Sequence, residues 1–177
     1  MTTIMANKLY QLNKNLKALC ISFLIVLSIG VAMGMAYIYL TTSMTIDGTE
    51  TRYAGDNIPE DFDPDIDVLE NPPKSALELV SHAHNHIIMF SFIFFLTALL
   101  FEKNSIIKGK WKRFLMIEAF ISILITFGGF FLIRFIDRGF SYLVITSSSI
   151  MYLSYYIMVA ICLYELIFVK NKVPKGE

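Results

Sequence analysis

The sequence predicts an all-α fold: an integral membrane four-helix bundle forming a single membrane domain, residues 1–177. The first observation is composition, because 55% of the residues are hydrophobic and 17% are charged, whereas soluble domains average about 45–50% and about 25%. The second is that the apolar residues gather in long runs, each near or above the roughly 20 residues that cross a hydrocarbon core. The predicted spans are residues 16–40, 77–101, 114–136 and 140–169.

These runs restrict the class of protein. They occupy more than half of the chain, which excludes a soluble enzyme, a nucleic-acid-binding protein and a disordered regulator. Each run is also too long for a strand of an outer-membrane barrel, which takes about 9–11 residues and alternates in polarity. We therefore expect membrane lipids as partners, and no nucleic acid.

The basic residues are distributed unevenly, and their distribution predicts an orientation. Three lie before or at the start of the first span (Lys8, Lys14 and Lys17), five in the 102–113 connection and three after the last span, which is eleven of the 15 Lys and Arg residues. The positive-inside rule then predicts that both termini and the 102–113 connection lie in the cytoplasm. The 36-residue acidic segment 41–76 between spans one and two would face outside and lie over the outer mouth of the bundle.

The first span and the residues before it carry their own local signals. Residues 1–15 are polar and basic, and we expect a short interfacial helix there. Gly30 and Gly34 are four residues apart, a spacing that lets helix backbones approach closely in lipid. They predict packing against another span or, alternatively, a homodimer interface.

The later spans have recognisable ends and bends. Ser75, followed three residues later by Glu78, is the capping-box pattern that starts a helix. In the third span, Gly128 and Gly129 indicate a bend or close packing. The connection at 136–140 is so short that spans three and four must form an antiparallel hairpin.

All histidines of the chain, His82, His84 and His86, lie within five residues at the start of the second span. At about 100° per residue, His82 and His86 are only about 40° apart on a helix, with Glu78 one turn earlier on the same stripe, whereas His84 points about 200° away from His82. A histidine pair at this spacing can chelate one metal ion. The predicted metal ligands are His82, His84, His86 and Glu78.

Imidazoles at this depth are costly unless they face the bundle interior, water or a metal. The alternatives are hydrogen bonds to headgroups, water or the outer segment; a ligand or proton-relay role; and, less favoured, a small proton-coupled transporter. The predicted cofactor is haem b or a transition metal, namely copper, zinc or iron. Because no other span contains histidine, a haem would need a different second ligand, a five-coordinate iron or a second subunit.

Besides Lys17 and Glu78, which lie at the very start of their spans, three charged residues lie inside the predicted spans. Arg134 is near the outer end of the third span, where it would either balance a carboxylate or haem propionate or extend to lipid phosphate. Glu118 lies toward the cytoplasmic end of the same span and would pair with Lys112 or Arg113, or alternatively take up protons. Glu165, near the end of the fourth span, reads as an interfacial residue.

Several short motifs resemble those of a family of small four-span bacterial membrane proteins. The motifs are Asp47-Gly48, Arg52-Tyr53-Ala54-Gly55, Pro73-Lys74-Ser75 with Glu78-Leu79, Ser81-His82-Ala83-His84-Asn85-His86, Arg134 and Ser141-Tyr142-Leu143. The resemblance implies an outer Tyr-x-Gly segment and a histidine pair, two residues apart, that opens the second span. A looser similarity to haem–copper oxidase subunit I and its small relatives, in which such a pair ligates haem, does not extend to oxidase activity. Phe90 or Ser91 replaces their usual glycine, and their other ligand histidines are absent.

The sequence thus predicts a respiratory or redox-associated membrane component with a metal or haem site at the outer mouth of the bundle. His84, Arg134 and Tyr142 are the predicted cofactor-binding residues, with Tyr142 among the fourth-span hydroxyls that could orient an imidazole. No catalytic residue is assigned, and a free-standing enzyme is not favoured. The alternative is a non-catalytic accessory or assembly subunit of a larger membrane complex. Partner subunits or a homodimer are expected in either case.

Overall fold

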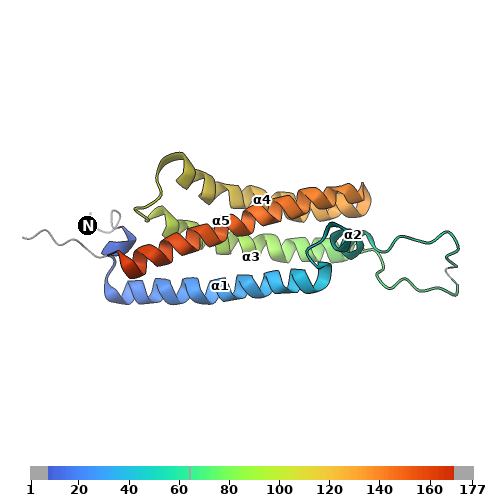
Figure 1. Cartoon of the computed structure of the whole chain (residues 1–177), viewed down its shortest axis with the longest axis horizontal. Helices are drawn as coiled ribbons and strands as arrows, with labels where there is room; N and C mark the ends of the chain where they lie inside the picture. The colour runs from blue at the N-terminus through green and yellow to red at the C-terminus, as the bar shows by residue number, and fades with distance from the viewer. Residues whose placement is uncertain (1–7, 64, 170–177) are drawn as a thin grey trace, which may run out of the picture.

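The computed structural model describes residues 8–63 and 65–169, and this part of the chain is helical without strands. Four long helices lie side by side, and a short helix, α2, sits at one end of them (Figure 1). Two 3-10 turns complete the described elements. In order, they are η1 (Leu9–Gln11), α1 (Lys14–Thr42), α2 (Ile46–Ala54), α3 (Ala76–Glu102), α4 (Gly109–Phe135), η2 (Arg138–Phe140) and α5 (Ser141–Phe168).

The four long helices are each long and apolar enough to cross a membrane, which confirms the predicted fold class. The largest difference is at α4, which begins at Gly109, before the predicted residue 114. The helix continues past the apolar run because Lys110–Arg113 are mostly good helix formers, and their side chains remain exposed or partly exposed at the interface. Hydropathy marks the apolar part of a span, whereas the hydrogen-bonded helix extends beyond it.

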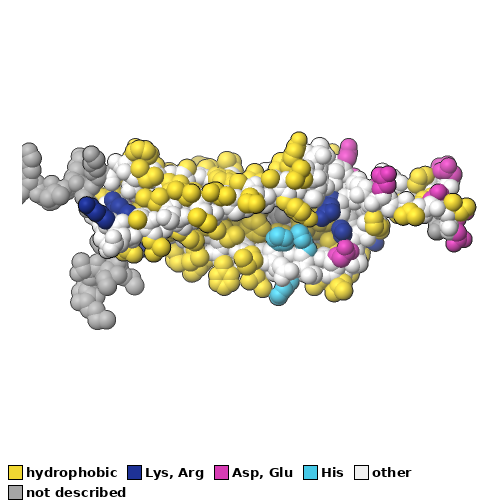
Figure 2. All heavy atoms as spheres, turned by 90° about the horizontal axis from the view of Figure 1, so that it is seen from below, with side chains coloured by type: hydrophobic (Ala, Val, Ile, Leu, Met, Phe, Trp, Pro, Cys, Tyr) yellow, Lys and Arg dark blue, Asp and Glu magenta, His cyan; other side chains and the backbone are white. Residues whose placement is uncertain are grey.

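The two ends of the bundle are formed by different elements, and both carry charged side chains. The α2 end holds α2, the start of α3 and the hairpin between α4 and α5, whereas the Lys-rich end holds the start of α1 and the 103–108 connection. In Figure 2, charged side chains gather toward the two ends, and hydrophobic side chains cover the surface between them. This is the pattern expected of a protein surrounded by lipid at its middle.

The acidic segment 41–76 divides into two parts, only one of which covers the bundle. Its first part forms α2, a helix that the sequence did not predict because so short and polar a stretch shows little apolar periodicity. Ser141 of α5 donates a hydrogen bond to Glu50 Oε1 over 3.0 Å and holds α2 against the bundle. The second part, a loop whose base is closed by Asn71 and Asp56, extends beyond the helices (Figure 1). The prediction that the whole segment covers the outer mouth is therefore wrong for this loop, whose apolar side chains Ile58, Ile66 and Val68 stay exposed instead of packing on the bundle.

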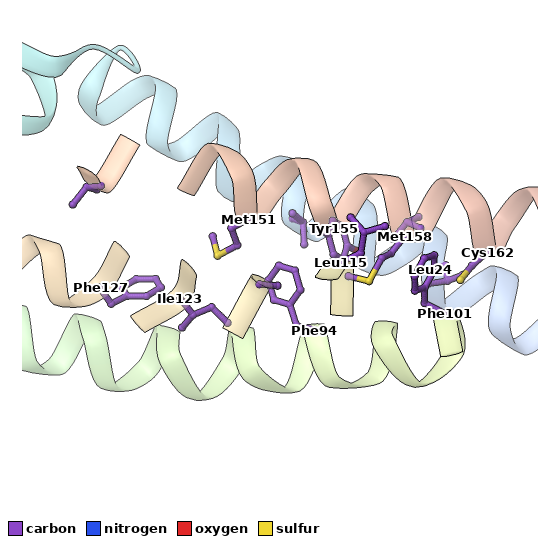
Figure 3. Close-up of a cluster of buried hydrophobic side chains, with 14 of the residues drawn as sticks. Leu24, Phe94, Phe101, Leu115, Ile123, Phe127, Met151, Tyr155, Met158 and Cys162 are labelled. Atoms are coloured by element: carbon purple, nitrogen blue, oxygen red, sulfur yellow. The ribbon is translucent and has the colours of Figure 1, made fainter. Parts of the chain in front are cut away.

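The core lies mainly between α3, α4 and α5. Figure 3 shows Phe94, Met151, Tyr155 and Met158 among the labelled side chains that fill the space between the helices. The antiparallel α4–α5 hairpin is packed most closely where the buried Gly129 faces Val144, since a Cβ on Gly129 would overlap with Val144 Cγ2. The sequence expectation of close packing is confirmed for Gly129, whereas Gly128 faces open space.

Helix α1 is the outermost of the four. In its apolar window only 11% of the residues are buried, compared with 50% in α4. Gly30 and Gly34 have no atom within 4 Å of the position where a Cβ would lie. The first of the two predictions for this pair, packing against another span of the same chain, is therefore wrong. These glycines form an open face toward the membrane.

The Lys-rich end is closed by the 3-10 turn η1 and by the α3–α4 connection. Leu9 is fully buried, and its backbone N–H donates to the carbonyl of Lys103 over 3.2 Å. Glu165 is also fully buried, and its Oε2 accepts a 2.7 Å hydrogen bond from the backbone N–H of Ser105. Glu165 thus lies at the Lys-rich end, as predicted, but is covered by the connection and not exposed.

Candidate functional site

The capping box at the start of α3 fixes where the histidines lie. Ser75 accepts from the backbone N–H of Glu78, and Glu78 Oε2 accepts in return from the backbone N–H of Ser75 over 2.8 Å. Lys74 Nζ donates to the other carboxylate oxygen over 3.1 Å. This cap satisfies free N–H groups of the first turn, so α3 is helical from its first residue. Histidines four residues apart in the sequence therefore lie on the same face of the helix.

His82 and His86 lie side by side on one face of α3. Their ring centroids are 4.2 Å apart and the rings meet edge to face. His86 stacks on Phe127 of α4 at 5.4 Å, and His82 lies 5.8 Å from Phe130 of the same helix. Both histidines are partly buried, and within the described residues no protein group hydrogen-bonds to either imidazole. The nitrogen atoms of the pair are therefore free for a ligand.

A hollow of about 480 Å³ lies beside this pair, lined by Leu77, Glu78, Ser81, His82, Asn85 and His86 of α3. Its volume falls in the range of small-molecule sites, about 300–1,000 Å³. In Figure 2, two histidine side chains lie together beside a recess in the surface, and the third points away from them. We call this hollow the histidine groove.

The four predicted metal ligands do not converge. His84 is exposed on another face of α3, as the helical step requires, so it cannot reach an ion held by the other two histidines. The carboxylate of Glu78 borders the groove, but both of its oxygens serve the cap and Lys74. The described part of the chain contains no group of three or more His, Cys, Asp or Glu side chains that could hold one metal ion. The chain therefore contributes one closely spaced imidazole pair.

The predicted cofactor-binding residues Arg134 and Tyr142 lie at the same end of the bundle but make other contacts. Arg134 Nε donates to the backbone carbonyl of Lys74 over 2.9 Å, and its guanidinium carbon lies 5.2 Å from the ring centre of Phe135. Arg134 thus holds the entry to α3 against α4. Tyr142 is 62% exposed on the outer face of α5. The structure does not bring either residue together with the histidine pair.

The aromatic wall behind the histidines was missed by the sequence analysis. It consists of Phe127 and Phe130 of α4 together with Tyr53 of α2, whose ring stacks on Phe130 at 4.0 Å. Burial raises the pKa of the Tyr53 phenol, so its hydroxyl remains protonated at neutral pH. The three-residue spacing of Phe127 and Phe130 was a signal that they share a helix face, but nothing in the sequence showed which face meets α3.

The family of the chain follows from a comparison with protein-family models. The model of one family, described as a transmembrane helical domain, matches residues 43–173. The chain belongs to the Aq_1264_TM family. The match confirms a family of small membrane proteins, whereas the Tyr-x-Gly and His-x-His signature and the similarity to haem–copper oxidases stay predictions. No curated protein and no solved structure matches the chain.

The matched region of the Aq_1264_TM family starts after α1 and includes α2, α3, α4 and α5. It therefore contains both histidines of the groove and the aromatic wall. Helix α1, the most exposed of the long helices, lies before it. The histidine groove thus lies within the region that the family model matches.

Proposed function

We propose that this chain is a respiratory or redox-associated membrane component in which His82 and His86 bind a transition-metal ion or a haem iron. One observation carries the proposal: the two imidazoles lie 4.2 Å apart in an open groove, without hydrogen-bond partners in the described part of the chain. Neutral imidazole is the commonest protein ligand for zinc, copper and iron. In this proposal the α2 end lies on the outer side of a bacterial inner membrane, as the basic residues predict.

The remaining ligands would come from outside this chain. Structural zinc sites take four protein ligands and catalytic sites three, whereas the groove offers two imidazoles with the side chains of Ser81 and Asn85 beside them. The groove is formed by one face of α3 and opens to the outside (Figure 2). A second copy of the chain would supply a second imidazole pair, so the expected stoichiometry is one metal ion or haem for two chains.

The test uses the full chain purified in mild detergent. Bound iron, copper and zinc are measured together with the visible spectrum, before and after loading with each metal and with haem. We expect His82→Ala and His86→Ala to abolish binding and His84→Ala to leave it unchanged. His84 is the matched control because it lies on the same helix but away from the groove. Equal loss in all three variants, or no saturable binding by the unaltered chain, would overturn the proposal.

The second candidate is a non-catalytic accessory or assembly subunit, and the open face of α1 favours it. Gly30 and Gly34 have no neighbours, although glycines at this spacing are typical of helix–helix contacts in membranes. Crosslinking in intact membranes from Gly30→Cys, compared with Leu40→Cys on the same helix, tests this candidate when it is combined with the metal-binding assay. An accessory subunit would give one defined heteromeric product from Gly30→Cys, whether or not metal binds to the histidines.

A further inference from the structure

Glu118 of α4 is a carboxyl group buried in the membrane-spanning part of the bundle. It is 9% exposed and lies four residues before the midpoint of α4, about 6 Å along the axis. Ser122 donates a hydrogen bond to its Oε1, whereas its Oε2 is buried without any partner in the described residues. An ionised carboxylate with an unpaired oxygen at this depth is costly, and a protonated carboxyl is far less so.

No cation compensates Glu118 in the described part of the chain. Lys112, one of its two predicted partners, lies 3.5 Å from the carboxylate of Glu102 instead and donates to backbone carbonyls of the α3–α4 connection. Helix α3 has no ionisable residue between His86 and Glu102, and α1 has none between Cys20 and Tyr37. The prediction that Glu118 pairs with Lys112 is therefore wrong.

Helix α5 also provides no cation for Glu118 among the described residues. Gly129 faces Val144, and Thr126 pairs with Ser147, so the antiparallel register places Glu118 at the depth of Tyr155. Tyr155 is fully buried, and its hydroxyl lies 3.4 Å from the hydroxyl of Ser28 on α1. The other groups on this side, in order toward the Lys-rich end, are Tyr156, Cys162, Tyr164 and Glu165.

Hydroxyl groups continue from Glu118 toward the α2 end. Ser122 and Thr126 follow at four-residue steps on the same face of α4, and both are buried. Ser122 is hydrogen-bonded directly to Glu118, and Thr126 lies about 6 Å further along the helix, a distance that one water molecule would span with two hydrogen bonds. Thr126 then lies 2.8 Å from the hydroxyl of Ser147 on α5. The ladder ends level with the histidine groove, because Phe127, next to Thr126, stacks on His86.

A second buried carboxyl lies between Glu118 and the Lys-rich end. Glu165 accepts from the backbone of Ser105 through one oxygen, while its Oε1 is buried without a partner in the described residues. The α4–α5 register places it level with the start of α4. The two carboxyls and the three hydroxyls of the ladder together extend from the Lys-rich end past the middle of the bundle.

We propose that Glu118 is a proton-binding site inside the membrane and that the hydroxyl ladder of Ser122, Thr126 and Ser147 carries its proton from Glu118 to the level of the histidine groove. Hydroxyl groups both donate and accept hydrogen bonds. Each therefore passes on its own proton as it receives one, and Glu118 regains a proton from the side of Glu165. Only protons move, and no bond between heavy atoms changes. The proposal does not depend on metal binding by the histidines.

The first test is chemical labelling of the full chain in lipid vesicles with a hydrophobic carbodiimide, which adds to protonated carboxyls that are reachable from lipid or through small gaps. Peptide mass spectrometry then locates the adduct. We expect labelling at Glu118 and none at Glu102, an exposed carboxyl group 3.5 Å from Lys112 Nζ. Labelling should be lost in Glu118→Gln. No adduct at Glu118 in the unaltered chain would overturn the proposal.

The second test measures proton flux into vesicles that contain a pH-sensitive dye, driven by a potassium gradient with valinomycin. The unaltered chain and the matched control Glu102→Gln should conduct faster than protein-free vesicles, and Glu118→Gln should fall to the protein-free rate. Ser122→Ala, a milder change, should slow the proton flux while Glu118 is still labelled. If Glu118→Gln fails to fold, the flux of Ser122→Ala serves as the test of the proposal. Flux equal to protein-free vesicles in the unaltered chain, or flux that neither Glu118→Gln nor Ser122→Ala changes, would overturn the proposal.

Discussion

Two adjacent glycines of α4 offer a sharp test of how the bundle is packed. Gly129 faces α5, and a Cβ there would overlap with Val144 Cγ2; a Cβ on Gly128 would meet no atom within 4 Å. Gly128→Ala and Gly129→Ala therefore make the same chemical change at neighbouring positions with different surroundings. We expect only the second to weaken the α4–α5 hairpin.

The magnitude follows from two opposing effects. Replacing glycine by alanine inside a helix gains up to about 1 kcal/mol in helix propensity, and this gain is nearly the same for both variants. Overpacking a filled site costs about 1–3 kcal/mol, and Val144 cannot turn away cheaply because a β-branched side chain in a helix has one strongly preferred rotamer. Since the propensity effect cancels, Gly129→Ala should be less stable than Gly128→Ala by about 1–3 kcal/mol.

The assay is unfolding in mixed detergent micelles, followed by circular dichroism, for both variants and for Val144→Ala. Val144→Ala removes the Cγ2 that would overlap, so the double variant Gly129→Ala/Val144→Ala should recover part of the loss, with a coupling of about 0.5–3 kcal/mol. Equal stability of Gly128→Ala and Gly129→Ala would refute the predicted packing. Strict additivity in the double variant would refute the specific contact with Val144.

Three further predictions concern the α2 end. Ser75→Ala removes the cap of α3 and should cost about 0.5–2 kcal/mol, seen as faster amide hydrogen exchange in the first turn of α3 than in its middle; unchanged exchange there would contradict the capping role. Tyr53→Ala removes the ring stacked on Phe130, so limited proteolysis within α2 should speed up, while Tyr53→Phe, which keeps the ring, should resist cleavage like the unaltered chain. Gly48→Ala places a Cβ against the carbonyl of Thr42, so α2 should detach and show the same increase in proteolysis, and a variant as resistant as the unaltered chain would argue against this close turn.

Much of the scaffold was predictable because it depends on local properties of the chain. Span length and hydropathy predicted the four long helices, and the pattern Ser75-x-x-Glu78 predicted the capping box that the structure contains. The pairing of His82 with His86, and the separate position of His84, followed from the helical step alone. These features require no knowledge of which helix packs against which.

The rest of the site depended on packing between helices. The residues of a membrane helix that face lipid are as apolar as those that face the core, so the sequence could not show that Phe127 and Phe130 face the histidines. It also could not show that α2 would bring Tyr53 onto Phe130, or that Lys112 would turn away from Glu118. Long side chains such as these choose among several partners within reach, and only the three-dimensional arrangement selects one.

The sequence by itself therefore determined the class of the protein, the number of its long apolar helices and the face that two of its histidines share. The tertiary structure alone decided that α1 keeps Gly30 and Gly34 open, that the predicted metal ligands reduce to one imidazole pair, and that Glu118 stands buried without a cation among the described residues. The physical reason is that helix formation in lipid is fixed by local hydrogen bonding and apolar length, whereas the contacts between helices arise from the fit of side chains distant in sequence.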